Sequence, residues 1–176
     1  MDRLPVAARA VGLAVLSVSA LAACSDFGGK GNTYTCPTAI TSPDLQTIAN
    51  IAPGNDPTNV LSAGQITRVS STCGRETAGI EAKVEINFNA MRTNTAVTQI
   101  TLPYFVAFAD NDGNVLGKRE FNIAVKFPPN EVSAPALEKI TAHLPLKNQQ
   151  LGNIYTIVVG FQLTQAELSF NRAHLK

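Results

Sequence analysis

The sequence predicts a mainly β domain, an antiparallel immunoglobulin-like β-sandwich with a short C-terminal helix. Residues 80–90 alternate strictly between apolar and polar side chains, which is the period of a half-buried strand. About six segments of strand character follow one another at short spacing, and turn residues rather than long helices separate them. This arrangement is typical of a sandwich of antiparallel sheets and not of a parallel sheet with crossover helices.

The composition describes a chain that folds as one domain. It has 176 residues, of which 45% are hydrophobic and 15% are charged, and it lacks tryptophan. The formal charge is +1, and it falls to zero without residues 1–23, which contain two arginines and one aspartate. A chain without a basic excess is a poor candidate for nucleic-acid binding, so we expect no nucleic acid among its partners.

The N-terminus has the pattern of a secretory signal. Arg3 and Arg9 precede an apolar run over residues 10–23, which is too short to cross a bilayer as a helix. The run ends in small residues followed by Cys24, which resembles a bacterial lipobox. We therefore expect a lipoprotein signal peptide at 1–23 and diacylglycerol and palmitate chains on Cys24; the alternative is an ordinary thiol near a signal cleaved elsewhere.

Two features follow from this signal. Ser25 rather than aspartate follows the cysteine, which favours the outer membrane on its periplasmic side, with the inner membrane or the cell surface as alternatives. Residues 24–35 are rich in glycine and are expected to form a flexible tether before a single sandwich domain at 36–176. In an oxidising compartment the two remaining cysteines, Cys36 and Cys73, are expected to form a disulfide.

The elements of the domain are expected as follows. A proline and apolar residues at helical spacing predict a short helix over residues 42–52, and residues 59–73 are expected to form a strand broken at Gly64. Further strands are expected at 80–90, 100–110, a run containing Phe121 to Phe127, 136–146 and 153–163. Pro145 indicates that its strand lies at a sheet edge. A capping box of Thr164 and Glu167 predicts the C-terminal helix from Gln165 to about Ala173.

Several segments together carry a family resemblance. They are CP at 36–37, DPTNV at 56–60, VSSTC at 69–73, LPYFVAFADNDGNVLGKREF at 102–121 and VGFQLTQAELSFNR at 159–172. The chain resembles a group of uncharacterised proteobacterial envelope lipoproteins that has no assigned activity. The resemblance implies export, a cysteine pair and a β-rich fold, and it implies no catalytic residue.

The residues that could bind a metal or take part in catalysis have simpler interpretations. Asp110 to Asn114 alternates carboxylate and amide side chains as calcium sites do, but it lacks the EF-hand spacing and is better interpreted as a hairpin turn. His143 and His174 are interpreted as surface histidines, and Glu81 and Glu85 as part of a solvated face. We therefore expect no catalytic residue, no metal and no cofactor.

The strands at 100–110 and 153–163 are apolar on both faces, which predicts that both are central in their sheet. Their second face, marked by Phe105 and Val158, is covered by the short helices or binds a partner. The expected function is therefore a non-enzymatic adaptor or stabiliser of an envelope protein assembly, which docks through strand edges or the 105/158 face. The alternative is a periplasmic hydrolase or ligand-binding enzyme accessory with a site built from loops.

Overall fold

The computed structural model describes residues 35–52, 59–145 and 154–174, and all of them belong to one compact unit. The predicted signal peptide 1–23, the acylation site Cys24 and all of the predicted tether 24–35 except Thr35 lie outside the described residues. In the described part of the chain, no helix is long and apolar enough to cross a bilayer.

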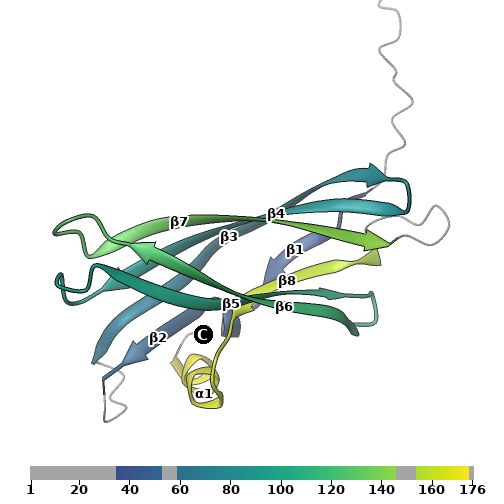
Figure 1. The fold of residues 1–176 in the computed structure, drawn as a ribbon. Helices are drawn as coiled ribbons and strands as arrows, with labels where there is room; N and C mark the ends of the chain where they lie inside the picture. Colours follow the sequence, from purple (N-terminus) through teal and green to yellow (C-terminus); the bar gives the residue numbers. More distant parts are fainter. Residues whose placement is uncertain (1–34, 53–58, 146–153, 175–176) are drawn as a thin grey trace, which may run out of the picture. The chain divides into compact units, whose positions relative to one another are not determined.

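Two four-stranded sheets form the domain (Figure 1). Sheet A has the strand order β1 (Thr38–Thr41), β8 (Thr156–Phe161), β5 (Gln99–Ala109) and β6 (Val115–Lys126). Sheet B has the order β2 (Thr47–Ile51), β3 (Val60–Glu76), β4 (Gly79–Arg92) and β7 (Ser133–Pro145). All pairs are antiparallel except β1 with β8. The predicted β-sandwich is confirmed.

The connections explain the immunoglobulin-like character. Neighbours β4 and β7 lie in sheet B, and neighbours β5 and β8 lie in sheet A. The chain therefore crosses from sheet B to sheet A twice, once after β4 and once after β7, as the B–C and E–F connections of an immunoglobulin domain do. The predictions that the 100–110 and 153–163 strands are central and that Pro145 lies on an edge strand are confirmed.

The strict alternation in β4 fills the core. Its inward residues are at most 2% exposed; they are Ile80, Ala82, Val84, Ile86, Phe88 and Ala90. Opposite them lie the inward side chains of β5 and β8, and the ring centroids of Phe88 and Tyr104 are 5.2 Å apart in an edge-on contact. The period-2 pattern thus assigned each side chain of this strand to its correct face.

The predicted helix over residues 42–52 is wrong. Residues Pro43–Leu45 form one 3₁₀ turn, η1, and β2 follows at once. The Ile66 N–H donates to the Gln46 carbonyl over 2.8 Å, and β2 then pairs along β3. The β-branched residues Thr47, Ile48 and Ile51 favour a strand, and sheet pairing outweighed an apolar spacing that only coincidentally matched a helix.

Strand β3 is not broken at Gly64. It continues through this glycine, and the irregularity in its pairing with β4 lies between Ile66 and Arg68 instead. A β-carbon on Gly64 would lie 2.7 Å from a terminal methyl carbon of Leu102 in the other sheet. The glycine therefore permits close packing between the sheets and does not mark a turn.

The predicted bond between Cys36 and Cys73 is confirmed. Cys36 lies two residues before β1 of sheet A, and Cys73 lies in β3 of sheet B. The Ser71 hydroxyl donates to the Pro37 carbonyl beside it. The disulfide thus joins the edge strand of one sheet to the other sheet.

The C-terminal helix is present as α1 (Gln165–His174), and its predicted capping box is confirmed. The Glu167 N–H donates to the Thr164 hydroxyl over 3.2 Å, and the Thr164 N–H donates to the Glu167 carboxylate over 2.7 Å. The sequence analysis missed Asn171, which is buried and donates from Nδ2 to the carbonyls of Asp44 and Thr47. These bonds hold α1 against η1 and β2.

Candidate functional site

The predicted partner surface lies on the outer face of sheet A. Val158 of β8 pairs with Ala107 of β5 on one side and with Ile40 of β1 on the other, so the three side chains share a face. Phe105 is on the same face, opposite Gly160. A shallow hollow of about 540 Å³ extends over this face from Phe105 and Val158 to the exposed Val115.

The short 3₁₀ turn covers one end of this face. A β-carbon on Gly160 would lie 2.8 Å from Cβ of Leu45 in η1 and 3.1 Å from the Phe105 ring. Lys118 also covers Phe105, with its Nζ 4.6 Å from the ring centroid. The helix α1 packs mainly against η1 and β2, so η1 alone covers the Gly160 end of the face, and no helix among the described residues covers the hollow beyond it.

The outer face of sheet B has more charged side chains, and it also exposes Met91 and Leu137. Its charges lie in neighbouring pairs: Glu81 with Lys83 at 3.1 Å, Glu85 with Lys139 at 3.2 Å, and His143 with Glu76 at 3.0 Å. His143 is exposed, as predicted, and Glu81 and Glu85 lie on the predicted solvated face. The side chain of His174 lies outside the described residues.

Three of these side chains converge from three strands. Potential ligand atoms of Glu76, Glu81 and His143 lie within 4.8 Å of one another. The sequence analysis did not group them, because only the pairing of Glu81 with His143 and the position of Glu76 at the end of β3 bring them together. A histidine and two carboxylates are ligands that zinc accepts. Here each carboxylate already pairs with a cationic or imidazole neighbour on an exposed surface.

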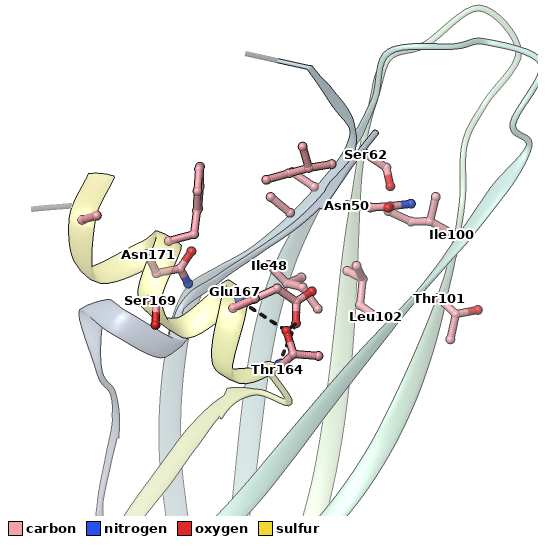
Figure 2. A pocket seen from close by; sticks show the side chains of 16 residues that line it. Ile48, Asn50, Ser62, Ile100, Thr101, Leu102, Thr164, Glu167, Ser169 and Asn171 are labelled. Carbon is pink, nitrogen blue, oxygen red and sulfur yellow. Dashed lines mark hydrogen bonds between the residues drawn. The ribbon is translucent and has the colours of Figure 1, made fainter. Parts of the chain in front are cut away.

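A second hollow, of about 910 Å³, lies between α1, β2 and the first half of β5 (Figure 2). The sequence analysis did not find it, and four of the residues that line it, Ile48 to Ile51, were assigned to a helix that does not form. Ile48, Ile100 and Leu102 provide its apolar side chains, and Figure 2 shows Thr164 and Glu167 joined by hydrogen bonds at its helix side. We call this hollow the α1 groove.

The α1 groove offers few side chains that could transfer a proton. Glu167 is the only ionisable side chain among the residues that line it, and its carboxylate is engaged in the capping box. In the core nearby, burial raises the pKa of Tyr104 to about 12, so its phenol stays neutral at physiological pH. An acid–base pair poised near neutral pH is therefore not assembled here among the described residues.

The residues from Asp110 to Asn114 form the turn of the β5–β6 hairpin. The Asp110 carboxylate accepts from the Asp112 N–H over 3.0 Å and from the Asn114 N–H over 2.8 Å. The hydrogen bond from the Asn114 side chain, together with these backbone bonds, lowers the pKa of Asp110. Gly113 has a φ of 82°, which favours glycine. The turn uses its polar side chains for backbone geometry, as the hairpin interpretation predicts.

Arg92 is a buried charge that the sequence analysis missed. It is 4% exposed, and its guanidinium donates to the carbonyls of Thr95, Val97, Pro128 and Glu131. Because four acceptors surround it, this arginine is a structural clamp on two loops and is not available to a ligand.

Comparison with known proteins identifies no relative: no family model, no functionally described protein and no solved structure matches the chain.

Proposed function

We propose that the protein is a lipid-anchored envelope lipoprotein whose sandwich domain acts as a non-enzymatic adaptor. In this proposal Cys24 carries the acyl chains and holds the domain at the periplasmic side of the outer membrane. The outer face of sheet A then docks an apolar surface of another envelope protein. The proposal concerns an assembly role and assigns no reaction to the chain.

The observation that carries the proposal is the apolar patch at β5 and β8 on the outer face of sheet A, which lies beside the charged Lys118 and Glu120 of β6. The Phe105 and Val158 side chains are half-buried within it, and Ile40 and Val115 at its margins are exposed. An apolar patch rimmed by polar residues is a feature of protein-binding surfaces. The two hollows described above give the enzymatic alternative little support, because Glu167 in one and Asp110 in the other are the only titratable side chains among the residues that line them.

The docking half of the proposal is tested by crosslinking in intact cells, followed by recovery of the tagged full chain. Wild type is compared with Phe105→Glu and Val158→Glu, and Glu85→Lys on the opposite face is the matched control. We expect a reproducible envelope partner for wild type and Glu85→Lys that both sheet A variants lose while circular dichroism shows them folded. The same partner in all four proteins, or turnover of a periplasmic substrate by the purified protein without any partner, contradicts the proposal.

The anchoring half has its own test. Cys24→Ser should give a protein that no longer incorporates labelled palmitate and no longer fractionates with membranes. Membrane association that is unchanged in Cys24→Ser would remove the lipid anchor from the proposal.

A further inference from the structure

The α1 groove is bordered by an edge of β2 that pairs with no strand in the part of the chain that the structure describes. Because the Ile66 N–H donates to the Gln46 carbonyl, alternate residues of β2 from Gln46 onward direct their backbone groups toward β3. Ala49 and Ile51 have the opposite phase, so their N–H and C=O groups point away from β3, and both residues line the groove. Thr47 shares that phase, and its carbonyl accepts from Asn171 over 2.7 Å, which places α1 against the same edge.

The opposite border of the groove is the first half of β5, which extends beyond the end of its neighbour β8. The Gln162 N–H donates to the Pro103 carbonyl over 3.0 Å, which is the last bond between β5 and the chain leaving β8. Pro103 has no N–H to return, and the chain turns into α1. Thr101 has the same phase as Pro103, and it faces the groove with no strand beside it among the described residues.

The other edge of sheet B has side chains that protect it against pairing, whereas the β2 edge, which α1 covers at Thr47, has no such side chains. The bond from the Arg92 N–H to the Val132 carbonyl sets the phase of β7 and makes its odd-numbered residues point away from β4. Pro135, Lys139 and Pro145 occupy such positions, and proline and lysine are the residues that block strand addition. Strand β2 has the sequence TIANI, which contains neither proline nor a charge.

We propose that the α1 groove binds an extended peptide segment of a partner protein, which adds to sheet B beside β2. The backbone of the segment pairs with Ala49 and Ile51, and alternate apolar side chains rest on Ile48, Ile100 and Leu102. A fatty acyl chain would match the apolar side chains but would leave the backbone groups of β2 unpaired. This binding site is separate from the outer face of sheet A and does not depend on the function proposed for that face.

The test is selection from a phage library of random twelve-residue peptides on the purified full chain. We expect enriched peptides with apolar residues at alternate positions. Ala49→Pro, which removes one N–H facing the groove and none that bonds to β3, should weaken their binding tenfold or more. Leu137→Pro is the matched control, because it removes an outward N–H from the protected edge of the same sheet, and Phe105→Glu tests independence from the other face. Both should bind as wild type does.

N-methylated versions of a selected peptide give a readout on the unaltered protein. Methylation of alternate amides, those that face β2, should abolish binding, whereas methylation of the amides between them should be tolerated. Equal tolerance at every position, equal binding by Ala49→Pro, or the absence of any enriched peptide overturns the proposal. Saturable binding of dodecanoate in place of peptides would assign the groove to an acyl chain, and dimerisation lost in Ala49→Pro would assign it to a second copy of this chain.

Discussion

The two outer faces of the sandwich differ although each covers the same core. On sheet B the outward residues of β4 from Glu81 to Asn89 are charged or amide side chains, and the charged ones have partners such as Lys83 for Glu81 and Lys139 for Glu85. On sheet A the outward positions of β5 and β8 hold Phe105, Ala107 and Val158. Sheet B demonstrates that a charged outer face is compatible with this fold. The apolar side chains at β5 and β8 are therefore not a requirement of folding, and in the adaptor proposal they form the docking surface.

The largest loss of stability is expected where a substitution introduces a charge into the core. Val84 is 1% exposed and lies one residue from the outward Glu85. Val84→Asp should lower the free energy of unfolding by more than about 4 kcal/mol and leave the domain unfolded, because it buries an unpaired carboxylate. Glu85→Lys should change stability by less than about 0.5 kcal/mol in urea denaturation, despite the loss of its exposed pair. Similar effects at both positions would contradict the assignment of faces.

The next largest effect is expected from the bond that joins the two sheets. Cys36→Ser combined with Cys73→Ser should lower the free energy of unfolding by up to about 4 kcal/mol, because the unfolded chain loses a loop closure of 37 residues. Urea denaturation of the oxidised and reduced wild type should show the same difference. Two titratable thiols besides Cys24 in protein taken from the periplasm would contradict the bond.

A smaller effect is expected where α1 meets β2. Asn171→Ala leaves the carbonyls of Asp44 and Thr47 without this donor and should cost about 2 kcal/mol. Arg172→Ala on the adjacent exposed position, where Nε lies 2.9 Å from the Asp44 carboxylate, should cost less than about 0.5 kcal/mol. Thermal unfolding followed by circular dichroism compares the two, and equal losses would mean that Asn171 does not anchor the helix.

The smallest loss of stability is expected at Val158, on the outer face of sheet A, where the substitution should instead affect partner binding. Val158→Glu places a charge on the outer face of sheet A at a half-buried position and should cost about 1 kcal/mol or less. Its expected consequence is loss of partner recovery, whereas Glu85→Lys changes neither property. A severe loss of stability in Val158→Glu would mean that the face belongs to the interior of the domain.

Period-2 alternation and turn chemistry made most of the fold predictable. The faces of β4, the hairpin at Asp110 to Asn114 and the capping box of α1 are all determined by residues close together in the sequence. The segment 42–52 was mispredicted because β2 depends on pairing with residues of β3 that lie 9 to 18 positions later, and its apolar spacing is compatible with a helix. Gly64 was misinterpreted for a related reason, since the group that requires it is Leu102 of the other sheet.

The two candidate sites also differ in whether residues close together in the sequence determine them. The surface at Phe105 and Val158 was predictable, because two strands with apolar residues on both faces must have a second apolar face. The α1 groove was not, because it depends on where β8 ends, on the backbone phase of β2 and on the docking of Asn171. The spacing of residues within a single segment does not indicate where β8 ends, how β2 is oriented or where Asn171 docks.

The most direct test of the adaptor proposal is site-specific photocrosslinking in living cells. A photoreactive residue replaces Val115 on the margin of the sheet A face or Lys139 on the sheet B face, and both positions are largely exposed, so neither change should disturb folding. We predict a discrete adduct with one envelope protein from position 115 and none from position 139. Adducts from both positions alike, or from position 139 alone, would contradict the claim that the apolar face is the docking surface.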